Sequence, residues 1–398
     1  MKFFTGIIFL LLSVSLVRAE SFRFKYAAGD KYRILSTVHE SVLINREKSH
    51  EAEILNRITV DVTGEGENGG KLSCSFQTSE EARGDYNVFS WGKSYESEFF
   101  RDSLGRYTID EKYFMPIVRN VPVFPDRDIR PGDTWEADGE EVHDFSASFS
   151  VREPVRFPIK VSYTYLGKEK YKDAEYHALS VSYDVHHRIK FRTNPGRLYP
   201  ALISGYSRQK IYWDEQRGWP QAYSEEFDFI FELSSGDSVE YRGTAAAEVI
   251  EAFTMNKEQM AQDIKQALEE AGLADLGVRQ DDLGITLMIE NIQFLPDSSI
   301  LTGAEKEKLD RIGEILQKYP DRDILISGHT ALAGTREGRQ KISEDRAASV
   351  GAYLLAKGVR TKERMVYRGL GADVPIAENS TEAGKSRNRR VEITILEN

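Results

Sequence analysis

The chain has 398 residues, a formal net charge of −11 and a single cysteine. This length suggests two or three domains, and 40% hydrophobic residues provide enough material for their cores, which excludes wholesale disorder. The lone cysteine, Cys74, excludes an internal disulfide framework and a thiolate metal cluster. The acidic balance argues against nucleic acid as a partner, because phosphate binding needs a basic surface.

Residues 1–19 have the composition of a secretory signal peptide. Lys2 precedes an apolar stretch from Phe3 to Val17, and Val17 and Ala19 form a small-residue cleavage site. The stretch is short for a membrane span, although an uncleaved anchor helix is the alternative. No cysteine follows the cleavage point, which excludes a bacterial lipoprotein anchor. We therefore expect an exported protein.

The chain from residue 20 to about residue 250 shows a hydrophobic period of two. Phe227, Phe229 and Phe231, for example, alternate with mostly acidic residues, and turn signals rich in Gly, Pro and Asn separate such runs. This pattern predicts an all-β domain over 20–250, either an antiparallel sandwich or an open barrel. The proline-rich stretch 116–131 marks a sub-boundary if the domain has two lobes.

The period changes to that of helices from about residue 254. A linker helix is expected within 251–279, because Met260, Ile264 and Leu268 are spaced four apart. Residues 280–398 then follow the order β-α-β-α-β-β, which predicts an α/β sandwich with helices on one face of a mixed sheet. The expected strands are 285–292, 323–327, 364–368 and 390–396, and the expected helices follow a capping box at 302–305 and span 338–357.

Several short motifs occur in a fixed order in this C-terminal region. They are Phe294 followed by Asp297-Ser298, Gly328-His329-Thr330 at a strand end, Ile342-Ser343 and Arg346-Ala347 on the second helix, Gly369-x-Gly371 with Pro375 and Asn379, and Asn388-Arg389-Arg390-Val391-Glu392-Ile393. Carried on the β-α-β-α-β-β frame, these motifs make residues 280–398 resemble the OmpA-like peptidoglycan-binding domain. The resemblance covers under a third of the chain.

The resemblance implies a binding site for the diamino acid of a peptidoglycan stem peptide. In the family, an arginine of the second helix holds the carboxylate of that diamino acid, and Arg346 has the matching spacing. The aspartate that receives the ammonium in the family is replaced by Ala331, and the usual asparagine seven residues before the arginine is replaced by Arg339. The carboxylate half of the site is thus expected, whereas the ammonium half needs a substitute acceptor such as Glu337 or Asp345.

The expected site combines residues of the second helix with residues from two strand ends. Losing one charge-assisted hydrogen bond typically costs roughly 1.5–3 kcal/mol, or about tenfold to a hundredfold in affinity, so the missing aspartate is expected to weaken or alter recognition. The expected site residues are Arg346, Thr330, Ala331, Ser343, Asn388, Arg389 and Arg390.

Each of these residues also has a purely structural interpretation. Arg346 continues the row of Ile342, Val350 and Leu354, which should face the sheet, so its charge needs a ligand or an internal carboxylate. The side chain of Asn388 could tie a turn, and Thr330 and Ser343 could cap backbone groups. Either Arg389 or Arg390 should point to solvent, because strand residues alternate.

The leading hypothesis is an exported, non-enzymatic protein of the periplasm that binds peptidoglycan through its C-terminal domain. The β-rich domain would contact another envelope protein or the outer membrane. No catalytic motif, metal site or cofactor site is found. Ala331 motivates one alternative, a protein-interaction module without wall binding. The other alternative makes the N-terminal half an outer-membrane barrel, although charged runs such as 45–48 and 168–170 interrupt its strands.

Overall fold

The computed structural model describes most of the chain after its first 18 residues. The described residues are 19–81, 88–146, 151, 154–190, 198–251, 255–290, 292, 294 and 298–397. The expected signal peptide therefore lies outside the described residues except for its last position, and so does Asp297 of the first motif. Among the helices of the described residues, none has both the length and the apolar composition needed to cross a membrane.

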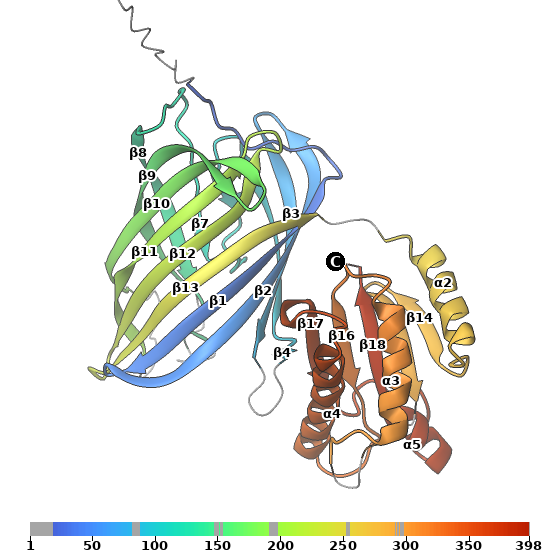
Figure 1. The fold of residues 1–398 in the computed structure, drawn as a ribbon. Helices are drawn as coiled ribbons and strands as arrows, with labels where there is room; N and C mark the ends of the chain where they lie inside the picture. The colour runs from blue at the N-terminus through green and yellow to red at the C-terminus, as the bar shows by residue number, and fades with distance from the viewer. Residues whose placement is uncertain are drawn as a thin grey trace, which may run out of the picture.

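The N-terminal domain is one antiparallel sheet of twelve strands, which curls into a nearly closed barrel (Figure 1). Its strands are β1 (Lys31–Ile44), β2 (Glu47–Gly66), β3 (Gly69–Glu80), β5 (Ser94–Asp102), β6 (Tyr107–Ile109), β7 (Val118–Arg119), β8 (Thr134–His143), β9 (Val155–Tyr171), β10 (Ala174–Arg188), β11 (Pro200–Asp214), β12 (Trp219–Leu233) and β13 (Ser238–Glu251). Their order is β6-β5-β3-β2-β1-β13-β12-β11-β10-β9-β8-β7. The all-β prediction is confirmed, and the open barrel describes this single sheet better than a sandwich of two sheets.

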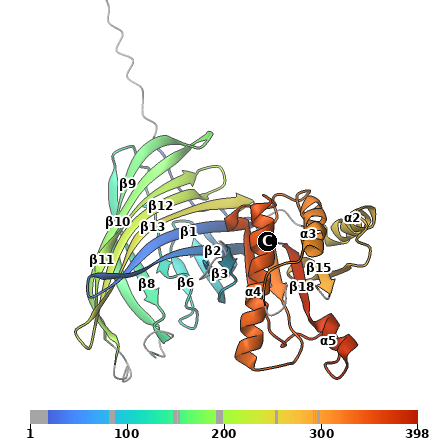
Figure 2. The same cartoon turned by 60° about the horizontal axis from the view of Figure 1, so that its bottom comes forward.

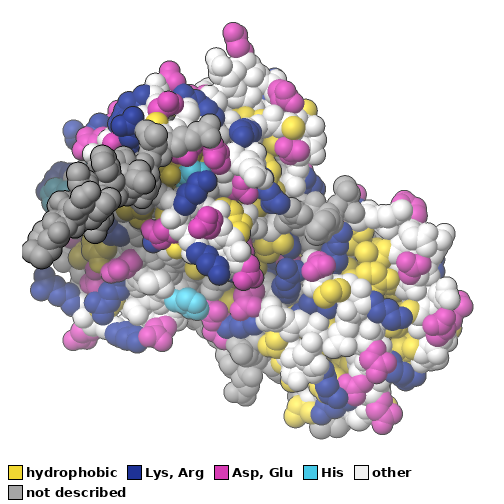
Figure 3. Space-filling model, turned by 45° about the horizontal axis from the view of Figure 1, so that its top comes forward, with side chains coloured by type: hydrophobic (Ala, Val, Ile, Leu, Met, Phe, Trp, Pro, Cys, Tyr) yellow, Lys and Arg dark blue, Asp and Glu magenta, His cyan; other side chains and the backbone are white. Residues whose placement is uncertain are grey.

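The alternation seen in the sequence separates the inside of the barrel from the outside. On β9, Phe157, Ile159 and Val161 are buried, whereas Lys160 and Ser162 between them are exposed. Residues of a strand point to opposite faces in turn, so the apolar set fills the interior and the polar set faces water. Figure 3 shows acidic and basic side chains interspersed over the visible surface of this domain.

The C-terminal domain is a mixed sheet with two long helices, α3 and α4, that cover one face (Figure 2). Its strands are β14 (Gly277–Asp281), β15 (Gly284–Glu290), β16 (Ile324–Gly328), β17 (Met365–Gly369) and β18 (Arg390–Leu396), and its helices are α2 (Lys257–Glu270), α3 (Gly303–Leu316), α4 (Arg336–Ala356), the 3-10 turn η1 (Lys362–Arg364) and α5 (Glu382–Asn388). The predicted strands and helices are all present, whereas β14 and α5 were not predicted.

Two local expectations about this domain are wrong. The helix predicted to be a linker, α2, buries Ala261, Ile264 and Leu268 in the same core as α3 and β15, so it belongs to the C-terminal domain. Thr302 is the N-cap of α3, but its side chain makes no capping hydrogen bond, so the capping box is not formed. The backbone N–H of Lys306 begins the helix by donating to the Thr302 carbonyl.

The two domains are joined by a buried interface as well as by the chain. The short strand β4 (Phe89–Ser90), which lies between β3 and β5 in sequence, pairs in parallel with β17 and extends the C-terminal sheet. Asp323, at the start of β16, accepts hydrogen bonds from Arg33 at 2.6 Å and from Arg57 at 3.1 Å. All three side chains are almost completely buried. Apolar contacts surround this ion pair and involve Leu55, Phe89, Leu325, Val366 and Leu396.

Candidate functional site

Three chain segments of the C-terminal domain meet at one end of its sheet. The Thr330 N–H, just after β16, donates to the carbonyl of Gly371, just after β17, at 2.8 Å. The His329 N–H donates to the carbonyl of Arg390, the first residue of β18, at 2.9 Å. The sequence-predicted residues of all three strand ends are therefore brought to the same place.

Ser343 joins helix α4 to this end of the sheet. Its hydroxyl donates to the carbonyl of Gln340 at 2.7 Å and accepts from the N–H of Gly371 at 2.9 Å. A Cβ atom at Gly369 would lie 2.5 Å from the Ser343 oxygen, so glycine is required for this close approach. Ser343 is fully buried, and both of its hydrogen bonds are internal, so it positions the helix.

Asn388 has the role of a tie between loops. Its side-chain oxygen accepts from the N–H groups of Ile376 and Ala377, and its amide donates to Ala377 and to the side chain of Asn379. Asn379 in turn accepts from the N–H of Leu332, just beyond Ala331. The buried Asn388 therefore fixes the two loops that border the site.

Arg390 is engaged in a buried ionic network. Its Nε donates to Glu392 at 2.7 Å, and Glu392 also accepts from Arg279 at 3.2 Å and lies 3.6 Å from His329. Burial favours the neutral carboxyl, but His329 and Arg390 outweigh it and lower the pKa of Glu392 to about 2. Burial lowers the pKa of His329, because it disfavours the charged imidazolium. Arg390 thus balances an internal charge, and Arg389 is the member of the pair that is partly exposed.

Arg346 differs from Arg390 because it forms no ion pair with any described residue. Its guanidinium carbon lies 5.0 Å from the centre of the Phe294 ring, a cation–π contact, and its Nε is buried without a hydrogen-bond partner among the described residues. Burial lowers the pKa of Arg346, and the positive charge of Arg389 lowers it further. The site thus holds a partly buried cation next to a second one.

The row of residues through Arg346 does not face the sheet along its whole length. Val350 and Leu354 are fully buried, but Ile342 is 38% exposed. The expectation for Ile342 was wrong, because the first turns of α4 extend beyond the sheet and the buried stripe passes through Ser343 and Ala347 instead. Arg346 lies at the transition, where a side chain can touch both the core and solvent.

The side chain of Ala331 provides no acceptor for an ammonium group. Ala331 is buried, and the Thr330 hydroxyl beside it is buried without a partner among the described residues. Of the two candidate substitutes, Asp345 forms an ion pair with Lys341 at 3.1 Å, and Glu337 is exposed in the first turn of α4. At these positions the structure therefore provides a cation for a carboxylate but no buried carboxylate for an ammonium group.

Comparison with known proteins identifies this part of the chain. Residues 293–389 match the model of the OmpA family. The C-terminal region is an OmpA family domain. The match spans the interval from the Phe294 motif to Arg389, so it includes Arg346 and the loops described above.

Individual relatives of the OmpA domain carry envelope names. The chain is 35% identical over 136 residues to the probable lipoprotein YiaD of Escherichia coli. The matched region covers 33% of this chain and 62% of that protein. It is 38% identical over 104 residues to the peptidoglycan-binding protein ArfA of Mycobacterium tuberculosis. This second match covers 26% of this chain and 32% of that protein. A solved outer membrane protein from Borrelia burgdorferi is 36% identical, over 30% of this chain and 96% of that one, with a TM-score of 0.25.

These relatives are matched over part of their length only. The chain spans between about a third and three fifths of the curated relatives named above. Their names, a lipoprotein and a peptidoglycan-binding protein, agree with the envelope location expected from the sequence.

Proposed function

We propose that the protein is a non-enzymatic protein of the periplasm, close to the outer membrane or the wall, that binds peptidoglycan through its OmpA domain. Arg346 holds the carboxylate of the stem-peptide diamino acid, and Arg389 adds positive potential beside it. The name of the related peptidoglycan-binding protein ArfA supports wall binding. The N-terminal barrel contacts another envelope component.

The observation that carries this proposal is the uncompensated guanidinium of Arg346. A partly buried arginine without a carboxylate partner is unfavourable, and a second arginine nearby adds repulsion. A bound carboxylate relieves both effects, because it supplies the opposite charge and two oxygens that match the planar fork of the guanidinium. The chemistry of the site therefore favours an anion of carboxylate size.

The proposal is tested by sedimentation of the full mature chain with purified sacculi. The variant Arg346→Gln should bind about tenfold to a hundredfold more weakly, which corresponds to one lost charge-assisted contact. The matched control is Lys341→Gln, which removes one positive charge from the exposed side of the same helix and should bind like the wild type. On the ligand side, a stem peptide whose diamino-acid carboxylate is amidated should lose the same factor. If Arg346→Gln pellets with sacculi to the same extent as Lys341→Gln and the wild type, the proposed role of Arg346 is wrong.

The absence of a side-chain acceptor at Ala331 favours a second candidate, a domain that has lost wall binding and serves as a protein-interaction module. The same experiment separates the two candidates. If the wild-type chain remains in the supernatant with sacculi of several stem-peptide chemistries, wall binding is wrong and the interaction module stands.

The barrel is proposed to lie in the periplasm rather than within the outer membrane. A membrane-embedded barrel needs an apolar outer band, but outward positions of β9 carry Lys160 and Ser162. The outer side of β1 and β2 is also occupied by the OmpA domain, through Arg33 and Arg57. Washing membranes at high salt or high pH tests this: the protein should be released, whereas an embedded barrel would stay.

A further inference from the structure

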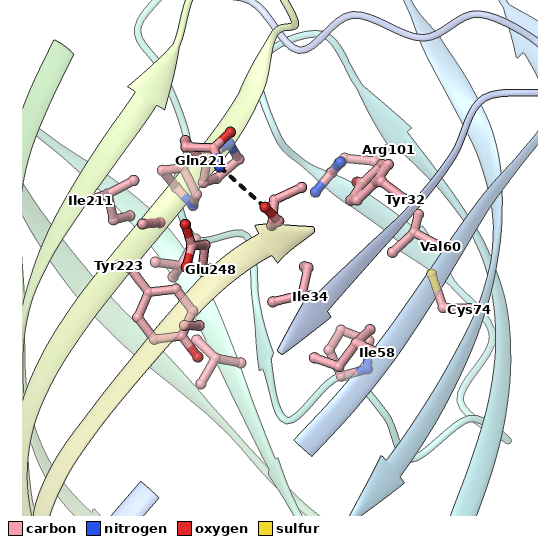
Figure 4. Close-up of a pocket in the computed structure, with 18 of the residues that line it drawn as sticks. Tyr32, Ile34, Ile58, Val60, Cys74, Arg101, Ile211, Gln221, Tyr223 and Glu248 are labelled. Atoms are coloured by element: carbon pink, nitrogen blue, oxygen red, sulfur yellow. Dashed lines mark hydrogen bonds between the residues drawn. The ribbon is translucent and has the colours of Figure 1, made fainter. Parts of the chain in front are cut away.

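The interior of the N-terminal barrel contains a cavity of about 250 Å³. Figure 4 shows it between β1 and β2 on one side and β12 and β13 on the other. Most of its wall is apolar, with Ile34, Ile58, Val60, Ile211 and Val249 among the lining residues. Protein interiors are close-packed and leave few voids larger than a water molecule, so a space of this size needs an explanation.

One charged side chain, Arg101 of β5, lines this cavity without a compensating carboxylate. Its Nε donates to the hydroxyl of Tyr26 at 2.8 Å, and its Nη1 donates to the hydroxyl of Tyr107 at 3.4 Å. The guanidinium lies 4.0 Å from the centre of the Phe24 ring. Within the described residues, Arg101 forms no ion pair; besides Tyr26 and Tyr107, its guanidinium also interacts with the hydroxyl of Tyr32. Figure 4 shows the guanidinium pointing into the cavity, so its positive charge faces the empty space.

The other polar groups of the lining already have partners. Glu225 accepts a hydrogen bond from Ser207 at 2.6 Å, and burial raises the pKa of its carboxyl, which favours the neutral form. Gln221 donates to a backbone carbonyl at 3.1 Å. Glu248 forms an ion pair with Lys172 on the outer side of the barrel. Arg101 is therefore the lining group, among those described, whose charge has no opposite charge paired with it.

We propose that the barrel binds an aliphatic carboxylate, whose head group pairs with the guanidinium of Arg101 and whose chain lies among the apolar residues of the cavity. One unmatched positive charge calls for a single negative charge, and the guanidinium fork matches the two oxygens of a carboxylate. The apolar wall matches an unbranched hydrocarbon chain, which gains by leaving water. This site is in the other domain, so it does not depend on wall binding by the OmpA domain.

The volume limits the ligand to a small amphiphile. Sites for small molecules typically enclose about 300–1,000 Å³, and this cavity of about 250 Å³ is slightly smaller than that range. A chain of medium length, such as that of decanoate, is thus the appropriate probe. Trp219 provides a signal, because its ring stacks at 4.6 Å on Tyr32, which lines the cavity.

The test is a titration of the full mature chain with decanoate and with decanol below their micelle or solubility limits, followed by tryptophan fluorescence and calorimetry. Decanoate should bind about tenfold to a hundredfold more tightly than decanol, because only decanoate forms the charge-assisted contact. In Arg101→Gln this preference should disappear, whereas Arg101→Lys should retain part of it. The control Arg106→Gln, at an exposed arginine of the same hairpin, should behave like the wild type.

A second variant tests the location of the chain without touching the charge. Ala247→Phe places a large apolar side chain in the cavity and should abolish binding of both probes while the melting temperature stays equal or rises. The proposal is overturned if the wild type binds neither probe, if it binds both equally, or if Arg101→Gln melts like the wild type and keeps its preference for decanoate. It is also overturned if a folded Ala247→Phe binds decanoate normally.

Discussion

Asp323 is the residue at which a single substitution should separate the two domains. Its carboxylate is 1% exposed and accepts from Arg33 at 2.6 Å and Arg57 at 3.1 Å, both of which come from the barrel. Burial lowers the pKa of each arginine, which means that the protein environment disfavours their charge unless the carboxylate compensates it. Asp323→Ala leaves two buried guanidinium groups without that partner.

The expected loss follows from the behaviour of buried ion pairs. Breaking such a pair by removing one partner typically costs about 3–5 kcal/mol, and 1 kcal/mol shifts the melting temperature of a domain of this size by about 2–4 °C. We expect a decrease of about 6–20 °C. The control is Asp138→Ala, whose carboxylate forms an exposed, solvent-screened pair with Lys160, so its loss should change the melting temperature little.

The two domains can be followed independently during urea unfolding. Trp135, Trp213 and Trp219 belong to the barrel, Trp91 lies at the interface and donates its backbone N–H to the carbonyl of Tyr367, and the long helices belong to the C-terminal domain. Tryptophan fluorescence should therefore report mainly on the barrel, and helical circular dichroism should report on the C-terminal domain. In the wild type the two transitions should coincide, and in Asp323→Ala they should separate. If the variant keeps coincident transitions and loses no more stability than Asp138→Ala, the interface does not hold the domains together.

Two further predictions concern the C-terminal domain. The pKa of Glu392 is lowered to about 2 from an ordinary value near 4.5, so the ionised carboxylate should stabilise the fold fully above pH 4.5, and this stabilisation should disappear as the pH falls towards 2. The unfolding free energies of the wild type and of Glu392→Gln should therefore converge between pH 4.5 and pH 2. If the two curves of unfolding free energy against pH stay parallel, this prediction is wrong. Gly328→Ala places a Cβ atom 2.0 Å from the Ser343 carbonyl oxygen and should destabilise the domain by about 1–3 kcal/mol, measured by thermal unfolding. Gly303→Ala, at a helical position with open space, should be neutral or stabilising by up to about 1 kcal/mol, and equal effects of both glycine variants would argue against the tight packing at Gly328.

The sequence predicts the elements of this fold better than it predicts their assembly. Period-two and period-3.6 patterns depend on which face of an element is buried, so they predicted the barrel strands and the helices α3 and α4. The same patterns do not say what lies against an outer face. Arg33 and Arg57 look like ordinary outward residues of β1 and β2, and only the folded chain places Asp323 between them. Strand β4, with two residues, is too short to show a period.

For the candidate site as well, the sequence predicted the residues better than it predicted their contacts. The motifs predicted which residues gather at the strand ends, but the roles of those residues depend on contacts with distant parts of the chain. Asn388 ties loops, as its structural interpretation allowed, whereas the pairing of Arg390 with Glu392 was not predicted. The isolation of Arg346 from carboxylates, and its contact with Phe294, are properties of the tertiary structure that spacing along a helix cannot reveal.

The pairing of β4 with β17 has a mechanical consequence. If the OmpA domain grips the wall while the barrel holds another part of the envelope, tension between them is shared by this strand pair and by the Asp323 contact. The chain between β13 and α2 carries the tension alone only after the β4–β17 pair and the Asp323 ion pair have both broken. Because β4 and β17 lie side by side and parallel, a pull along the strands loads their hydrogen bonds in shear, so that they resist together.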